Sequence, residues 1–399
     1  MIVPFNPLGM QARRRFRLPP IPSCMVSSQA HPLRRLLFQL HLWLGVSVGL
    51  VLLAIGVSGS ALVFRPEIEE ALYVPRVAVS DSALPVEIIL ATVAARYPDR
   101  RVSRVQFSAD RDHALEFVVS KLGARSLKEA QQVRVFANPY TGEIVGSREQ
   151  QASWVFVLQD FHFSLLGGVT GLKVNGVVGG VLMLMSLTGL VAWWPTRGRW
   201  RNSLRINTSA SWKRITWDMH AVMGFVSSLV LMLFGLTGVF YGFRAPMTQV
   251  LLWSVNGAPP TPAPKSTRAA SLATIDAVLR SASEAVPNAR ILALRTPASP
   301  TSPWVASASI RNHSGEGEDR IYVDAGTAEV LRIDRPSEMP RGARILEMVN
   351  PVHLGTFGGV GTRALWFLFG LVPLALFATA MVMWWNRVLA PRWRRRITA

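Results

Sequence analysis

Residues 39–50 read QLHLWLGVSVGL, and this stretch is apolar apart from His41 near its start. It belongs to an apolar run over 36–64, and three further runs cover 172–194, 217–243 and 364–385. A helix needs about 20 residues to cross a hydrocarbon core of about 30 Å, and each run is long enough. The sequence therefore predicts four membrane spans, and an ionisable side chain in such a span is a candidate functional residue.

The net charge of +19 is unevenly distributed along the chain. Segments 1–36, 195–216 and 387–399 carry Arg and Lys but no Asp or Glu. The long loops 65–161 and 244–361 are nearly neutral, with 12 basic residues each against 13 and 10 acidic ones. By the positive-inside rule, we expect both termini in the cytoplasm and both long loops outside. The basic excess is a topology signal, so no nucleic-acid partner is predicted.

Cys24 is the only cysteine, which excludes an intrachain disulfide and any four-cysteine zinc or iron–sulfur site. The N-terminal residues are rich in Pro, Arg and Ser, and a disordered cytoplasmic tail is predicted over 1–33. The first apolar run is too long for the core of a cleavable signal peptide and is expected to serve as an anchor.

The chain reads as a duplication. A shift of 179 residues places the third run on the first, and a shift of 191 places the fourth on the second. The matched residues include His41 with His220, Gly45 with Gly224, Gly56 with Gly235, Ser58 with Thr237, Gly59 with Gly238, His162 with His353, and Trp193-Trp194 with Trp384-Trp385. Two such units in the same orientation are expected to pack around a pseudo-two-fold axis along the membrane normal.

The two external loops also match each other. FANPYTGEIV at 136–145 parallels YVDAGTAEVL at 322–331, and both read as a strand, a turn and a second strand. Upstream, ILATVAARYP at 89–98 and IDAVLRSASEAVP at 275–287 read as amphipathic helices. Each loop is therefore predicted to be a small α+β module in which a helix precedes a hairpin.

The duplication produces two histidine pairs at opposite sides of the membrane. His41 and His220 lie near the cytoplasmic ends of the first and third runs, whereas His162 and His353 lie just outside the second and fourth. Two imidazoles that face each other across a bundle axis can ligate a b-type haem. Two haems, one near each face, would form an electron path across the membrane.

Other interpretations stay open from the residues alone. A histidine near a helix end is often an uncommitted interfacial residue, and duplication copies residues whether or not they function. The glycines that recur on the face of His41 either admit a porphyrin or only let helices pack. A bare metal site is less favoured, because no carboxylate or thiol recurs beside both members of either pair. The cations that could neutralise haem propionates, or else anchor the spans at the interface, are Lys173, Arg363, Arg35 and Arg214.

The stretches HLWLG at 41–45, GVSGSALVFRPEIE at 56–69 and WDMHAVMGF at 217–225, with the TGEIV-type turns, resemble the PepSY-associated transmembrane family. The resemblance covers the chain from about residue 31 onward. It implies a bacterial inner-membrane protein with two periplasmic PepSY-type modules. Members of the family include iron-regulated proteins and di-haem ferric-siderophore reductases.

For this sequence, the resemblance implies an oxidoreductase in which His41, His220, His162 and His353 are axial ligands of two b haems. It implies electron transfer to a ferric siderophore or another ferric chelate in the periplasm. The sequence contains no Walker loop and no GxGxxG fingerprint, so the electron donor is expected to be a quinol or a separate reductase. The alternative is a non-enzymatic PepSY membrane protein that acts as a sensor, a peptide-binding protein or a protease-modulating partner.

The predicted fold is an α-helical four-span bundle in the lipid bilayer, built from two parallel repeats, each with a small periplasmic α+β (PepSY-like) module. The predicted segments are a tail 1–33, a first span 34–65, a module 66–160, a histidine segment with the second span 161–195, a basic cytoplasmic loop 196–215, a third span 216–244, a second module 245–350, a histidine segment with the fourth span 351–386, and a cytoplasmic tail 387–399.

Overall fold

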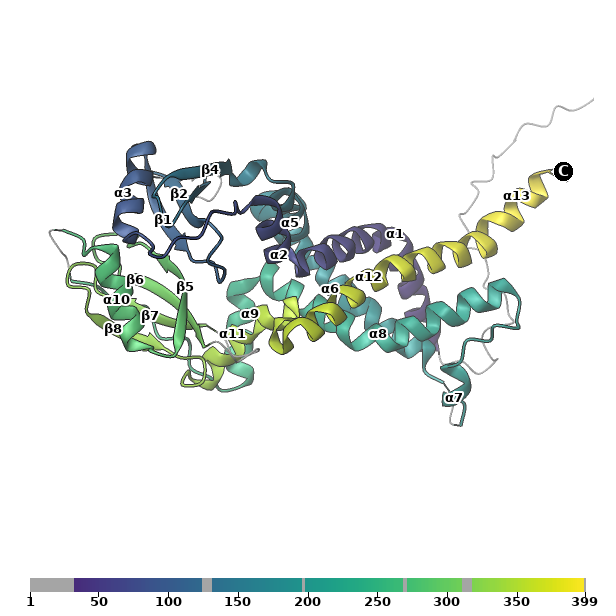
Figure 1. Cartoon of the computed structure of the whole chain (residues 1–399). Coiled ribbons are helices and arrows are strands. Elements are labelled where there is room, and N and C mark those ends of the chain that lie inside the picture. Colours follow the sequence, from purple (N-terminus) through teal and green to yellow (C-terminus); the bar gives the residue numbers. More distant parts are fainter. Residues whose placement is uncertain (1–31, 124–130, 196–197, 268–270, 311–317, 398–399) are drawn as a thin grey trace, which may run out of the picture.

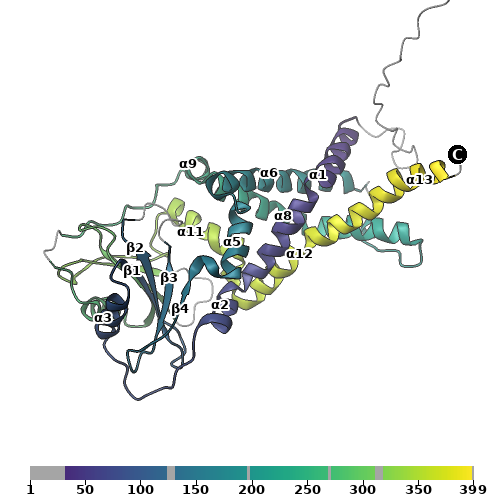
Figure 2. The same cartoon turned by 90° about the horizontal axis from the view of Figure 1, so that it is seen from above.

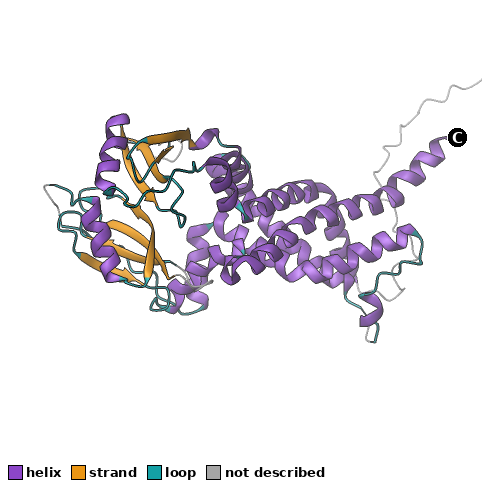
Figure 3. Ribbon diagram, viewed as in Figure 1, coloured by secondary structure: helices purple, strands orange, loops and turns teal. Residues whose placement is uncertain are grey.

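The structure is a computed structural model that describes residues 32–123, 131–195, 198–267, 271–310 and 318–397. Long helices run side by side in one part of the molecule, and the strands gather beyond one end of them (Figures 1 and 3). The predicted disordered tail over 1–33 lies almost entirely outside the described residues.

Four of the described helices are long and apolar enough to cross a membrane. They are α1 (Pro32–Val63), α6 (Gly168–Trp193), α8 (Trp212–Gly242) and α12 (Gly359–Trp384), the last continued by a π-helical turn η4 (Trp385–Leu389) and by α13 (Ala390–Ile397). A helix satisfies its own backbone hydrogen bonds, which a segment in hydrocarbon must do. Each of the four apolar runs of the sequence is therefore a helix of spanning length.

The four long helices approach one another at glycines. A Cβ on Gly179 of α6 would lie 2.8 Å from the carbonyl oxygen of Gly235 on α8. A Cβ on Gly56 of α1 would lie 2.6 Å from the carbonyl oxygen of Gly370 on α12. Helix α1 also contacts α6, and α8 also contacts α12, so α1 and α8 lie diagonally across the bundle.

Short helices connect the spans to the sheet. Helices α2 (Arg65–Tyr73) and α9 (Arg244–Ser254) follow α1 and α8, and helices α5 (Trp154–Ser164) and α11 (Arg341–Leu354) precede α6 and α12. Leu165 follows α5 and Gly355 follows α11, and both have the left-handed conformation that redirects the chain into the next span. The remaining short turns are η2 (Gln150–Ala152), α7 (Trp200–Ser203) and η3 (Thr356–Gly358).

Eight antiparallel strands form one sheet in the order β4-β3-β2-β1-β5-β6-β7-β8. The strands are β1 (Arg100–Gln106), β2 (Leu115–Lys121), β3 (Val133–Ala137), β4 (Ile144–Glu149), β5 (Ala289–Arg295), β6 (Trp304–Ile310), β7 (Asp319–Val323) and β8 (Val330–Asp334). The predicted hairpins are β3–β4 and β7–β8, and both form. The other four strands, and the joining of the two halves through β1 and β5, are additions to the predicted modules.

The sheet is joined at its centre by a pair of buried residues. Val105 on β1 lies opposite Leu294 on β5, and both are fully buried. Helices α3 (Val86–Arg96) and α10 (Ile275–Ala285) supply the other side of this core, with Ile89 and Val278 fully buried. Figure 2 shows α3 on the side of the sheet away from the bundle.

Helices α3 and α10 cap each other's N-termini. The carboxylate of Asp276 accepts the backbone N–H groups of Val86 and Glu87 at 2.9 and 3.1 Å. In return, Oε2 of Glu87 accepts the N–H of Ile275 at 2.7 Å. Each acidic side chain therefore lies at the positive end of the other helix and satisfies N–H groups that have no partner within that helix.

The sheet face opposite α3 and α10 is tied to the connecting helices. Arg134 on β3 pairs with Glu69 of α2 at 3.2 Å. On the other half, Arg320 of β7 pairs with Glu347 of α11 at 2.8 Å. This face is therefore turned toward the bundle.

The reciprocal caps give a stability prediction. In the variant Asp276→Ala, two N–H groups of α3 lose their acceptor, and we expect the free energy of unfolding to fall by about 1–2 kcal/mol. Faster amide hydrogen exchange over residues 86–93 is expected with it. Glu284→Ala, at an exposed site on the same helix, is the control and should change neither quantity. Equal losses in both variants would contradict the role of the caps.

Candidate functional site

The inner histidine pair consists of His41 on α1 and His220 on α8. Their ring centroids are 6.4 Å apart, and the ring planes are inclined at 85°. The two rings meet because α1 and α8 lie diagonally across the bundle, with each imidazole directed to its interior. The pair lies toward the ends of these helices that are farther from the sheet.

The outer histidine pair consists of His162 on α5 and His353 on α11, at the end of the bundle that carries the sheet. Their ring centroids are 6.1 Å apart and the planes are inclined at 50°. Aromatic rings of α8 surround His353, with Tyr241 at 5.4 Å and Phe234 at 6.1 Å between centroids. The structure thus brings the four predicted histidines together in the two predicted pairs.

A hydroxyl group contacts Nδ1 of every one of the four imidazoles. The contacts are Thr188 Oγ1 to His41 at 3.2 Å, Thr379 Oγ1 to His220 at 2.9 Å, Ser58 Oγ to His162 at 3.2 Å, and Thr237 Oγ1 to His353 at 2.7 Å. In two of the rings, Nδ1 also contacts a backbone carbonyl oxygen. The distance from this oxygen to Nδ1 is 3.1 Å for His41 and 3.0 Å for His162.

The hydroxyls determine which ring nitrogen carries hydrogen. Each donates its own hydrogen to a carbonyl one turn earlier in its helix, as Thr237 does to Leu233 at 2.9 Å and Thr379 to Ala375 at 2.8 Å; Ser58 and Thr188 do the same. A hydroxyl whose hydrogen is used in this way accepts the hydrogen of the imidazole. The hydrogen of each neutral ring is therefore on Nδ1, and the lone pair of Nε2 is left to bind a ligand.

The outer imidazoles are neutral at physiological pH. Burial lowers the pKa of His162. Burial, and then the facing ring of His162, lowers the pKa of His353 to about 3. Neutral imidazole is the form that coordinates a metal.

The separation of the rings matches that of two imidazoles on one metal. A metal lies about 2.0 Å from an imidazole nitrogen, and that nitrogen lies about 1.1 Å from the centre of its ring. Two imidazoles that bind one metal from opposite sides therefore have ring centroids about 6.2 Å apart. The observed separations of 6.4 and 6.1 Å agree with this value. Each pair could therefore hold a metal centre that needs two axial imidazoles.

Two glycines leave space beside the rings. A Cβ on Gly59 would lie 2.6 Å from Cε1 of His162, and a Cβ on Gly189 would lie 2.9 Å from Cε1 of His41. Gly56, by contrast, contacts the backbone of α12. Of the glycines expected on the face of His41, some therefore serve helix packing, while Gly59 adjoins the outer pair.

Several of these residues were not identified from the sequence. Ser58 and Thr237 were matched by the first shift, but no role followed from the match. Thr188 and Thr379 were not singled out, although the shift of 191 also places one on the other. Gly189 was missed because the corresponding position of the other half is an alanine.

Two of the cations proposed as propionate partners already have carboxylate partners. Arg363 donates to both carboxylate oxygens of Glu67 at 2.5 and 2.6 Å. Arg214 donates to Asp218 at 2.8 Å. Arg363 therefore ties α12 to α2, whereas Arg214 pairs with a residue one turn later in its own helix, α8.

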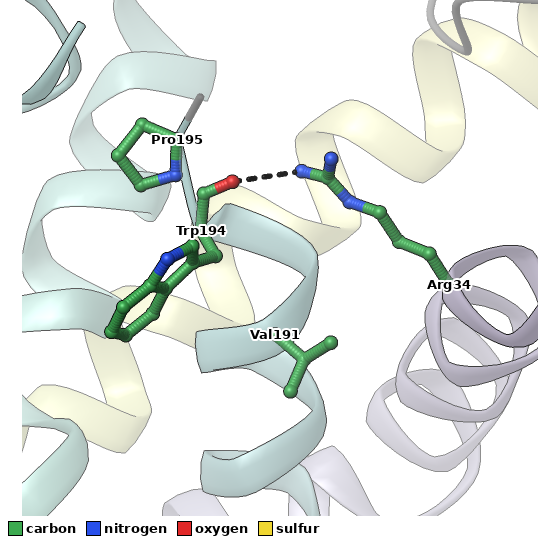
Figure 4. Close-up of a pocket in the computed structure, with 4 residues that line it drawn as sticks. All are labelled: Arg34, Val191, Trp194 and Pro195. Carbon is green, nitrogen blue, oxygen red and sulfur yellow. Dashed lines mark hydrogen bonds between the residues drawn. The ribbon is translucent and has the colours of Figure 1, made fainter. Parts of the chain in front are cut away.

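A cavity of about 350 Å³ lies at the end of the bundle away from the sheet, lined by Arg34, Val191, Trp194 and Pro195 (Figure 4). Arg34 reaches from α1 and donates to the carbonyl oxygen of Trp194 at 3.2 Å, at the C-terminus of α6. Val191 is one helical turn from Thr188, which holds His41. The cavity therefore lies about one helical turn from the hydroxyl that contacts His41.

A third group of ionisable side chains lies outside both pairs. Among the described residues, Glu70, Asp110 and His113 place their ligand atoms within 4.8 Å of one another and could hold a metal ion. No role was predicted for His113, which has no counterpart in the other half.

Comparison with known protein families agrees with the resemblance seen in the sequence. The family described as the PepSY-associated TM region matches residues 38–387. No curated protein matches the chain. The family match includes the sheet and nearly all of the four long helices, and the chain therefore belongs to the PepSY-associated transmembrane family.

Proposed function

We propose that this protein is a di-haem electron carrier of the bacterial inner membrane that reduces ferric chelates in the periplasm. The observation that carries the proposal is that four histidines form two facing pairs, with every Nδ1 held by a hydroxyl. Haem b, bound by each pair, would supply one-electron transfer.

The donor set favours haem over a bare metal ion. Each site offers two neutral imidazoles, which is the axial ligand set of a six-coordinate haem, whereas a bare zinc ion takes four protein ligands in a structural site. The inner pair contains His41 and His220, and the outer pair contains His162 and His353. Hydroxyls that accept from Nδ1–H fix the ring orientation and strengthen Nε2 as a donor.

The positions of the pairs suit transport of electrons across a membrane. His41 and Ser58, which holds His162, are 17 residues apart on α1, which corresponds to about 26 Å of helix. The hydrocarbon core is about 30 Å thick. The arginine-rich segments support an inner pair on the cytoplasmic side, with the sheet and the outer pair on the periplasmic side.

The proposed architecture consists of two parallel repeats, each with a periplasmic PepSY-like module. The order of long helix, short helix, helix, four strands, short helix and long helix occurs twice along the described chain, which supports the duplication. The four hydroxyls support it further, because Ser58 and Thr237 correspond under one shift and Thr188 and Thr379 under the other.

The sheet face turned toward the bundle is the proposed docking surface for the ferric chelate. Arg104 and Arg295 lie directly opposite each other on β1 and β5, and like charges in this position are destabilising unless an anion lies near. Burial, and then Arg295, lowers the pKa of Arg104. The carboxylates of Glu116 and Glu318 offset part of this repulsion, and an anionic chelate would relieve the rest at the centre of the sheet.

The electron donor is a quinol or a separate reductase. The cavity beside Arg34 and Trp194 supports an approach to the inner pair from the cytoplasmic side of the bilayer, since it lies one helical turn from Thr188.

The central test is the haem content of the purified protein. We expect a red protein with two b haems per chain by pyridine haemochrome assay. His220→Ala should remove one haem and leave the other, because the outer pair shares no ligand with the inner one. His353→Ala should do the converse. His113→Ala, which alters a histidine outside both pairs, is the control and should retain both haems.

The same preparation separates the proposal from the alternative function. Protein reduced with dithionite should be reoxidised by a ferric chelate, with one Fe²⁺ formed for each electron removed. A colourless protein from haem-replete cells would contradict the proposal and would favour a non-enzymatic sensor, peptide-binding or protease-modulating protein. Loss of both haems in every single-histidine variant would contradict two independent sites.

A second prediction concerns the hydroxyl at His353. Thr237→Val preserves side-chain shape but removes the acceptor at Nδ1, so the imidazole becomes a weaker donor to ferric iron. Loss of a hydrogen bond worth about 1 kcal/mol should raise the midpoint potential of the outer haem by about 40 mV. Thr216→Val, a partly buried site on the same helix whose hydroxyl donates to the carbonyl oxygen of Trp212, is the control. An unchanged potential in Thr237→Val, with both haems bound, would contradict the assigned role.

A further inference from the structure

Glu70, Asp110 and His113 have the arrangement of a metal site on the sheet side of the bundle. Glu70 lies on α2, and the other two lie in the turn between β1 and β2. Nδ1 of His113 is 3.3 Å from Oε1 of Glu70 and 3.7 Å from Oδ2 of Asp110.

These distances are close to the edges of a coordination polyhedron. Two ligand atoms that bind one ion at about 2.1 Å with tetrahedral geometry are about 3.4 Å apart. The two distances from His113 bracket this value, so an ion could reach all three side chains with small side-chain rotations. The three ligand atoms already lie within 4.8 Å of one another.

The imidazole of this group is held in place by the fold. The side chain of His113 is only 6% exposed. The turn that carries it is attached to the segment after α2, because the N–H of Ala114 donates to Pro75 at 3.1 Å and the N–H of Val77 donates to Asp112 at 2.7 Å. Helix α2, and with it the carboxylate of Glu70, is thereby fixed against the buried ring.

The charge of the group favours a divalent cation. Two carboxylates lie around one imidazole, and their side chains are 45% and 66% exposed, so an ion can enter from solvent. The neighbouring Arg76 pairs with a different carboxylate, that of Asp112, at 2.9 Å. One imidazole nitrogen with carboxylate oxygens suits Fe²⁺, Mn²⁺ or Zn²⁺.

We propose that Glu70, Asp110 and His113 bind a divalent transition-metal ion, and that this ion is the Fe²⁺ released from a ferric chelate after its reduction. The identity of the ion rests on the proposed function, whereas the existence of the site does not. Fe²⁺ passes from the chelate to the site without a further change in oxidation state. The hydrogen on Nδ1 of His113 moves to Nε2, and the contact of Nδ1 with Ser108 Oγ at 3.2 Å is given up to the ion. The ionised carboxylates of Glu70 and Asp110 supply the other two bonds to the ion.

The location of the site suits reception of the reduced iron. Glu70 is 11 residues beyond Gly59, which adjoins His162, so about 17 Å of chain separates the site from the outer pair. Both lie at the end of the bundle that carries the sheet. Capture there would keep Fe²⁺ from rebinding to the chelate while it leaves the protein.

The test uses Mn²⁺ as the probe with the full-length, tag-free protein in detergent. Free Mn²⁺ gives a six-line electron paramagnetic resonance signal that is lost on binding, and we expect one Mn²⁺ bound per chain. Asp110→Asn, at an exposed position, should weaken binding at least about tenfold, and His113→Asn should do the same. Asp112→Asn, in the same turn, is the matched control and should bind as the unmodified chain does.

Fe²⁺ added without oxygen should displace the Mn²⁺, since Fe²⁺ binds N/O ligands more tightly. Absence of Mn²⁺ binding, or equal binding by Asp110→Asn and the unmodified protein, would overturn the site. Failure of Fe²⁺ to displace Mn²⁺ would overturn the assignment to iron. A protein that lacks haem but binds Mn²⁺ through these residues would contradict the proposed function and leave the metal site intact.

Discussion

The hydrogen bond from imidazole Nδ1 to a helix hydroxyl is the interaction on which the rest of the site depends. In all four cases the hydroxyl belongs to a different helix from the histidine, as Thr237 of α8 does for His353 of α11. The hydroxyl already donates to its own helix, so it can only accept, and the imidazole can only donate. A ring held in this way within an apolar bundle presents one basic nitrogen, and the facing ring presents another about 6 Å away between ring centres.

These hydrogen bonds also connect the helices. His41 of α1 is held by α6, and His220 of α8 is held by α12, so the inner pair brings all four long helices together. The outer pair depends in addition on the sheet. Helix α5 follows β4 and α11 follows β8, and these are the two edge strands of the sheet. The join between β1 and β5 therefore helps to set the separation of His162 and His353.

The sequence predicted the spans and the two histidine pairs, because long apolar runs and gap-free shifts are strong signals. It did not predict the hydroxyls Thr188 and Thr379, because a threonine in an apolar helix bonds to its own backbone in most cases, and only the partner helix reveals its second role. The joining of β1 to β5 was also missed, since pairing between residues so far apart in sequence is decided by tertiary packing. Haem was favoured by the family resemblance more than by the residue pattern, and the structure adds the ring spacing and the Nδ1 hydrogen bonds that suit it.

Low-temperature electron paramagnetic resonance of the oxidised protein tests the central claim most directly, because it reports the axial ligands of ferric iron. Two imidazoles on each iron predict low-spin ferric signals from two centres. One signal should disappear in a variant of His41, and the other in a variant of His162. A protein with no ferric haem signal, or with only a high-spin signal from iron that lacks a second strong axial ligand, would contradict the account.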